Sequence, residues 1–190
     1  MSTDTTALEQ QYSDIKATNT LTLKHKHQML MIQATIYHKT FKLASLNDQN
    51  FLLKYFDQIM RWQLYDIYLL ECTLNMMPSE KIKPYISDIL VQYIRTENKV
   101  YVSDIILTLI VKYLESSIVQ KKDVITDWIL LKLADLEIRE NSNFKVWFLF
   151  LIALYQHDTK KINQAYTVTD YLNNPCLKKK FNLIQSIYLR

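Results

Sequence analysis

The chain has 190 residues, of which 49% are hydrophobic and 22% charged, and its net charge at pH 7 is +4. This balance of apolar and charged residues is that of a globular protein and excludes disorder over most of the chain. Because the chain contains no glycine, it lacks the Gly-rich phosphate loops, dinucleotide-binding fingerprints and Gly-flanked nucleophile elbows that many enzymes use.

The N-terminal part of the chain predicts three helices. A short helix covers about residues 5–17, a long one about residues 21–46, and an aromatic-rich one about residues 50–75. The long helix has two separate apolar faces, which is typical of a helix that packs between neighbours. It also has a basic side, so we expect it to supply a surface for a partner protein or for a second copy of the chain.

From Pro78 onward the hydrophobic pattern becomes regular and predicts six helices in three pairs. Asn stands at several positions where Gly would normally end a helix, and Asn is the next-best residue for that left-handed conformation. Asn174 and Pro175 mark the start of the last helix, because Pro is favoured at the first helical position. The expected pairs are residues 80–96 with 100–116, 123–139 with 144–156, and 159–172 with 175–188.

The longest uninterrupted apolar run covers residues 146–155. A helix needs about 20 residues to span a bilayer, so this run is too short to cross a membrane. We therefore expect no membrane association and interpret the run as part of the core, with Trp147, Leu151 and Leu154 buried.

One segment of the regular region is similar to a known repeat. Residues 82–90 carry Pro84 near their start, and a short polar turn then leads to the apolar residues 100–114. This arrangement resembles a HEAT repeat, although the later pairs lack both the Pro and the usual Arg. The resemblance covers about residues 79–190 and implies an all-α, HEAT-like array of about three helical hairpins that follows longer N-terminal helices. An irregular helical bundle is the alternative.

The resemblance also bears on domain organisation and function. The length and the helical pattern predict a single all-helical domain over residues 1–190 with N-terminal helices over residues 1–78, and the resemblance implies the hairpin array over residues 79–190. HEAT-like solenoids mostly act as scaffolds, because their stacked repeats present extended binding surfaces.

Residues with catalytic or metal-binding chemistry are few. The four histidines do not have the spacing of a zinc site, and neither Cys72 nor Cys176 has a histidine nearby in sequence. We expect the histidines to face solvent or line a groove, and Cys176 to be a buried structural thiol. The sequence therefore predicts no catalytic site, no metal and no cofactor.

Two further features bear on the compartment of the protein. Two cysteines do not make a disulfide framework, and the N-terminus has no apolar stretch typical of a signal peptide. We therefore expect an intracellular protein, either nuclear or cytoplasmic.

Charge is distributed unevenly along the chain. Residues 1–47 carry five lysines and three acids, residues 48–158 carry twelve basic and fifteen acidic residues, and residues 159–190 carry six basic residues and one acid. Basic ends therefore flank an acidic middle.

Two groups of basic residues are candidates for partner binding. The first holds two lysines and two histidines within about 60° on the long helix. The second lies where the second helix of each pair begins, a place at which the helix dipole disfavours a cation. Either group can bind an acidic protein surface or a phosphate backbone, or be an ordinary solvated helix face. The candidates are Lys24, His27, His38, Lys42, Lys99, Lys145, Lys178, Lys179 and Lys180.

These observations favour a non-catalytic helical scaffold or adaptor subunit of an intracellular multiprotein complex, with other proteins as partners in a hetero-oligomer. The alternative is a nucleic-acid-associated protein that uses its basic N- and C-terminal patches. Against the alternative, arginine occurs at only four positions and no Arg-rich element is present that would read bases.

Overall fold

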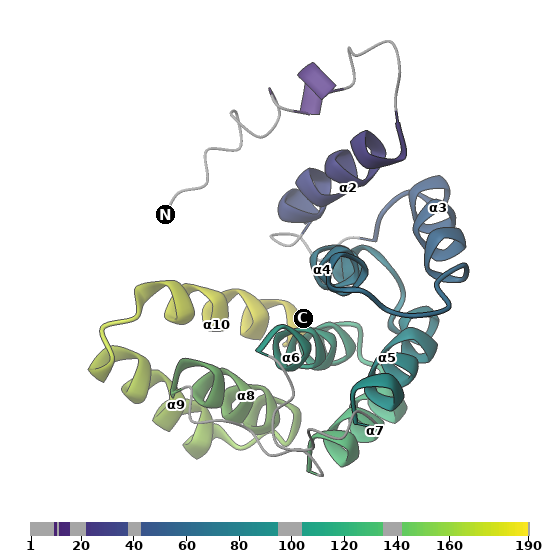
Figure 1. Cartoon of the computed structure of the whole chain (residues 1–190). Coiled ribbons are helices and arrows are strands. Elements are labelled where there is room, and N and C mark those ends of the chain that lie inside the picture. Colours follow the sequence, from purple (N-terminus) through teal and green to yellow (C-terminus); the bar gives the residue numbers. More distant parts are fainter. Residues whose placement is uncertain are drawn as a thin grey trace. The chain divides into compact units, whose positions relative to one another are not determined.

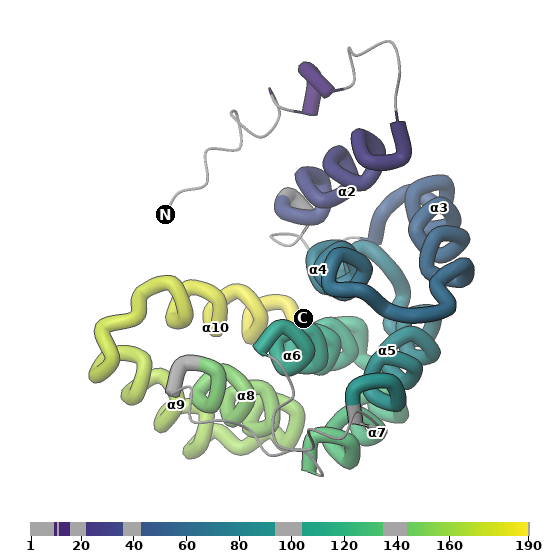
Figure 2. The backbone as a smooth tube through the Cα atoms, in the orientation of Figure 1, coloured from purple at the N-terminus to yellow at the C-terminus, as the bar shows by residue number. Residues whose placement is uncertain are grey.

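The structure of the chain is a computed structural model that describes residues 10, 12–15, 22–37, 43–94, 104–134 and 142–189. The regular secondary structure of these residues is entirely helical, with no strand, as the ribbon and the tube show (Figures 1 and 2). The chain divides into two compact units, Met1–Tyr85 and Ile86–Arg190, and the division falls within helix α5.

Six helices follow Pro78 in the described part of the chain, as the sequence predicts, and the bounds of the last one agree with the prediction at both ends. Of the predicted helix over residues 5–17, residues 10 and 12–15 are described and are helical. The elements are α2 (Leu23–Tyr37), α3 (Leu46–Phe56), α4 (Leu64–Thr73), the 3-10 helix η1 (Leu74–Met76), α5 (Ser79–Ile94), α6 (Asp104–Val119), α7 (Asp123–Ala134), α8 (Ser142–Tyr155), α9 (Thr159–Tyr171) and α10 (Pro175–Tyr188).

The prediction of one long helix over residues 21–46 is wrong at its C-terminal end. Residues 43–45 are not helical, and α3 begins directly after them. Ser45 caps α3, because its side-chain oxygen accepts a hydrogen bond from the backbone N–H of Asp48 at 3.2 Å. The backbone N–H of Ala44 donates to the carbonyl of Met76 at 2.9 Å, which ties this segment to η1.

The prediction of a single helix over residues 50–75 is also wrong, since α3, α4 and η1 occupy this stretch. The chain leaves the helical conformation after Phe56, and Trp62 is buried with its ring stacked on that phenylalanine. A new helix then begins at a cap, in which the backbone N–H of Gln63 donates to the Asp66 carboxylate at 3.0 Å. The burial of Trp62 therefore accompanies the end of α3, and the Gln63 cap starts α4. Neither Gly nor Pro is involved.

The core of the first unit lies where α2 packs against α4 and η1. Leu30 and Ala34 supply the buried side of α2, while α4 is buried along most of its length. The largest fully buried side chains of this unit are Phe56, Leu30, Leu52, Ile67, Leu69, Leu70, Leu74, Met76 and Met77.

In the second unit, α6 is the most buried element and packs against α7, α8 and α10. Figure 1 shows α6 nearly end-on, beside α8 and α10. The rings of Phe150 and Phe181 stack with centroids 3.8 Å apart and fill the space between α8 and α10. The expected burial of Trp147, Leu151 and Leu154 is confirmed, since these side chains are 8%, 0% and 1% exposed.

Residues other than glycine end three of the described helices in the left-handed conformation. Lys121, His157 and Asn173 have φ angles of 55°, 54° and 48°. After each of them, the next backbone N–H bonds to the carbonyl five positions earlier, which is the Schellman arrangement. The expected use of Asn in place of Gly is therefore confirmed at Asn173, whereas Lys and His take this role at the other two turns.

The starts of α9 and α10 have side-chain caps. The Asp158 carboxylate accepts a hydrogen bond from the N–H of Lys161, and the Asn174 side chain accepts one from the N–H of Leu177, both at 3.0 Å. The expected start of the last helix at Asn174 and Pro175 is confirmed.

None of the described helices is both long enough and apolar enough to cross a membrane.

Candidate functional site

Helix α8 is apolar on two opposite sides. Trp147, Leu151 and Leu154 recur at helical spacing and face the core of the second unit. Leu149 falls on the other side of the helix by its 3.6-residue period, and it is 52% exposed. An apolar side chain that remains exposed on an otherwise buried helix marks this side as a candidate binding surface.

Helix α9 supplies the opposite wall of a groove. It follows α8 after the short turn at His157 and packs against it. Ala165 is buried at this wall, and Val168, one turn further along, is 39% exposed. The groove has a volume of about 630 Å³ and is lined by Val146, Leu149, Ile152, Lys161, Gln164, Ala165, Thr167 and Val168.

The groove is apolar along its length and carries cations near its ends. Lys161 lines it, with its ammonium group 3.3 Å from Asp158 and most of its side chain exposed. Lys145 is exposed and lies one helical turn before Leu149, on the same side of α8. None of the described residues that line the groove is acidic.

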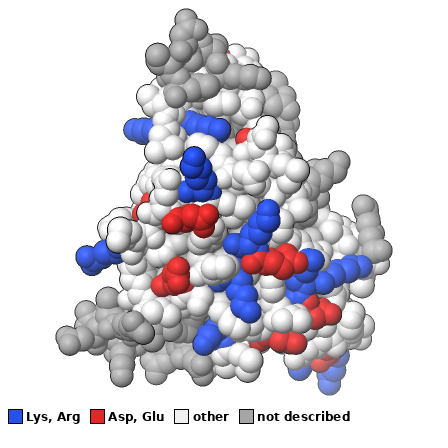
Figure 3. All heavy atoms as spheres, turned by 90° about the vertical axis from the view of Figure 1, so that its right-hand side faces the viewer, with Lys and Arg blue, Asp and Glu red and all other residues white. Residues whose placement is uncertain are grey.

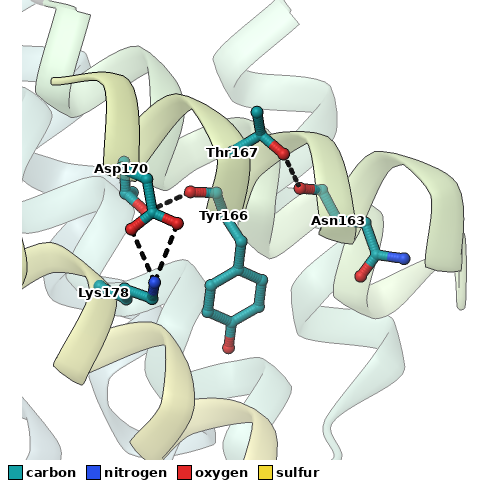
Figure 4. Close-up of polar contacts among 6 residues, drawn as sticks. Asn163, Tyr166, Thr167, Asp170 and Lys178 are labelled. Carbon is teal, nitrogen blue, oxygen red and sulfur yellow. Dashed lines mark hydrogen bonds and ion pairs between the residues drawn. The ribbon is translucent and has the colours of Figure 1, made fainter.

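Contacts with α10 hold α9 in place from the side that faces away from the groove. The Lys178 ammonium binds both carboxylate oxygens of Asp170, at 2.6 and 2.9 Å (Figure 4). The Tyr166 side chain extends toward α10, where its hydroxyl donates to Gln185 at 2.9 Å. Within α9, the Thr167 hydroxyl donates to the carbonyl of Asn163.

The candidate lysines at the starts of the second helices have different surroundings. Lys178 pairs with Asp170, as described above. The Lys180 ammonium lies 2.9 Å from the fully buried Glu115 carboxylate and 3.4 Å from the centroid of the Trp147 ring. Lys179 is exposed, and Lys99 lies outside the described residues. The cluster around Glu115 was missed by sequence reasoning, because its members come from three helices.

His27 is buried, which corrects the expectation that it faces solvent or lines a groove. Its Nδ1 lies 2.9 Å from the Tyr65 hydroxyl, and its ring packs edge-on against Tyr55 at 4.4 Å. Burial lowers the pKa of His27, and the nearby Asp66 carboxylate opposes this effect. Lys24 is exposed, while His38 and Lys42 lie outside the described residues.

The described residues contain no group of three or more His, Cys, Asp or Glu side chains placed to hold a metal ion. Cys176 is exposed, which corrects the expectation of a buried structural thiol, and Cys72 is half-buried.

Comparison with known protein families finds none that matches the sequence, and comparison with curated proteins finds no match either.

Proposed function

We propose that the protein is a non-catalytic helical adaptor that binds another protein through the groove between α8 and α9. The observation that carries this proposal is the exposure of Leu149 and Val168 over an apolar groove of about 630 Å³. Helices that expose an apolar groove commonly receive the apolar face of a helix from a partner. The expected setting is a hetero-oligomeric complex.

For the helices of the second unit, we propose an irregular bundle around α6 rather than an open HEAT-like array. In a solenoid each repeat contacts only its neighbours. Here α6, from the first expected pair, packs against α10, from the third. The Pro84 inside α5 and the packing of α9 on α10 remain features shared with the HEAT-like alternative.

Association with nucleic acid is the second candidate function, and the charges support it less. Lys178 and Lys180 already pair with acids of the same unit. On the face shown in Figure 3, Lys and Arg side chains are interspersed with Asp and Glu. A phosphate backbone is better bound by a continuous basic surface.

The proposal is tested by comparing Leu149→Asp with Leu131→Asp. Leu131 is 70% exposed on α7 and serves as a matched control, because it receives the same change outside the groove. Proteins captured by each variant are identified by mass spectrometry, and binding is repeated with the purified partner. We expect Leu149→Asp to lose a partner that Leu131→Asp retains, with unchanged helical circular dichroism in both. Retention of every partner by folded Leu149→Asp would refute the proposal.

A further inference from the structure

We infer that the ligand of the α8–α9 groove is an amphipathic helix of a partner protein, with an apolar stripe about two turns long and acidic residues beyond both ends of that stripe. This inference rests on the proposed function and adds the chemistry of the partner. Three properties of the groove support it: its length, its apolar lining and the charges near its ends.

The length of the groove fits two turns of a helix. On α9 the groove is lined from Lys161 to Val168. Seven residues of α-helix rise about 10 Å, which equals the rise between apolar residues at positions i and i+7 of a ligand helix. A ligand with apolar residues at i, i+4 and i+7 therefore places one side chain at each end of the groove and one at its centre.

The groove is also shaped for apolar side chains. Ala165 is buried and lines it, and a methyl side chain lets a ligand approach the backbone of α9 more closely than a larger residue would. Leu149 and Val168 are the partly exposed side chains on either side. None of the described lining residues is aromatic or Arg, so the groove lacks the stacking surfaces that single-stranded nucleic acid uses.

The charges near the groove determine which kind of partner helix it can bind. Because α8 and α9 are joined by a three-residue turn, they run antiparallel and the end of α8 lies beside the start of α9. Lys161 is therefore near one end of the groove, and Lys145 is near the other. The Lys161 ammonium is also 3.3 Å from Asp158, but this pair is exposed and weak, so Lys161 can still bind an acidic ligand. Residues 142–189 contain six lysines, two aspartates and neither glutamate nor arginine. A ligand with acids at both ends complements this distribution, and a basic ligand is repelled by it.

The test uses two fluorescent helical peptides that share Leu at positions i, i+4 and i+7. One carries Glu pairs at both ends of the stripe, and the other carries Gln at the same places. Binding to the full chain is followed by fluorescence anisotropy at low and at physiological salt. We expect the Glu peptide to bind more tightly than the Gln peptide, with a difference that shrinks as salt rises.

Charge-reversed variants locate the acidic contacts. Lys145→Glu and Lys161→Glu should each lower the affinity for the Glu peptide by about three- to tenfold, as expected for partly exposed ion pairs. The affinity for the Gln peptide should remain almost unchanged. Lys132→Glu is the matched control, because Lys132 is exposed on α7, and it should affect neither peptide.

The outcomes separate this inference from the proposed function. If both peptides bind equally and Leu149→Asp abolishes both, the groove is a binding site but the acidic partner is wrong. The inference is also overturned if neither peptide binds. Self-association of the chain that Leu149→Asp abolishes would overturn it as well, since a second copy would then cover the groove.

Discussion

At the scale of single residues, Leu149 and Leu151 show how two leucines of one helix differ in role. They are two positions apart in α8, so they point to opposite sides, and they are 52% and 0% exposed. Leu151 belongs to the core, and Leu149 belongs to the groove.

Truncation of these two leucines should therefore have very different effects on stability. We expect Leu151→Ala to lower the free energy of unfolding by about 2–5 kcal/mol, because it removes buried methyl groups and leaves a cavity. Leu149→Ala, the same change at an exposed position, should cost less than about 1 kcal/mol. Urea unfolding of both variants measures the difference, and similar losses would contradict the assignment of the two sides.

The sequence could predict the buried side of α8 but not the groove. Trp147, Leu151 and Leu154 recur at helical spacing within an apolar run, so their burial follows from the pattern. Leu149 on the opposite side is equally apolar, and residue type alone does not tell an exposed apolar side chain from a buried one. The signal was the all-round apolar character of the helix, which is consistent either with complete burial or with an absent partner.

His27 is a residue whose charge state is tied to burial. Its ring lies between α3 and α4, where Tyr55, Tyr65 and Asp66 face it, and Lys26 next to it on α2 lies over the Phe51 ring. The Asp66 carboxylate is engaged by the Tyr55 hydroxyl at 2.6 Å. His27 Nε2 is buried, and no described residue forms a hydrogen bond with it, so a proton placed there is poorly stabilised.

The lowered pKa of His27 predicts a loss of stability in mild acid. Above its ordinary pKa of 6.5, His27 is neutral in both the folded and the unfolded chain. As the pH falls below this value, the unfolded chain binds a proton that the folded chain binds only at lower pH, so the free energy of unfolding decreases. Urea unfolding at about pH 7 and about pH 5 should show this loss, and His27→Gln should reduce it.

His157→Gln is the control for this pH dependence, because His157 is exposed. His27→Gln should change the pH dependence more than this control does, because His27 is buried. An unchanged dependence in His27→Gln would show that other groups cause it.

At the scale of elements, Glu115 joins three helices of the second unit. It lies fully buried on α6, and one of its carboxylate oxygens receives both the Lys180 ammonium from α10 and the Trp147 Nε1–H from α8, at 2.9 and 3.0 Å. The other oxygen is buried without a hydrogen-bond partner among the described residues. The charge of a carboxylate buried in this way depends strongly on the Lys180 ammonium for its stabilisation.

Removal of that cation should be costly. Lys180→Met should lower the free energy of unfolding by about 3–5 kcal/mol, because it leaves a buried charge without its partner. Adding Glu115→Gln should restore part of this loss, since the amide removes the charge and keeps an acceptor for Trp147. A double-mutant cycle in urea measures the coupling. Lys179→Met, at the exposed neighbouring position, is the control, and an equal loss there would contradict the role of the ion pair.

Helix ends differ in how well the sequence predicts them. The bounds of α10 were predictable because Asn174 caps its start and Pro175 occupies the first position. The break after α3 was not, because it depends on contacts between residues far apart in sequence. The Tyr85 hydroxyl donates to the Asp57 carboxylate at 2.7 Å just after α3 ends, and the residues around Asp57 do not predict this contact.

At the scale of the whole molecule, the net charge of +4 includes cations that are already paired. Lys178 and Lys180 each lie within 2.9 Å of a carboxylate. Fewer lysines are therefore free to contact phosphate groups directly than the sequence suggests, although the net charge is unchanged by this pairing.

Binding to nucleic acid should accordingly be weak. We expect duplex DNA and RNA to bind detectably only at low salt and to be released at physiological salt, because few phosphate contacts can form. A salt titration by fluorescence anisotropy measures this. Tight binding at physiological salt, with a steep log-linear dependence on salt, would instead support the nucleic-acid alternative.

The left-handed turns at Lys121, His157 and Asn173 contain no glycine, so single substitutions to glycine there can raise the free energy of unfolding. A residue other than glycine in the left-handed conformation costs about 1–2 kcal/mol, and part of this cost is offset because glycine loses more entropy on folding. Lys121→Gly should therefore raise the free energy of unfolding by about 0.5–1 kcal/mol, and Asn173→Gly by less, since Asn tolerates this conformation. If Lys121→Gly destabilises the protein in urea, the turn is not strained. If Lys121→Gly instead stabilises the protein, selection of random variants for thermal stability should enrich glycine at these turns.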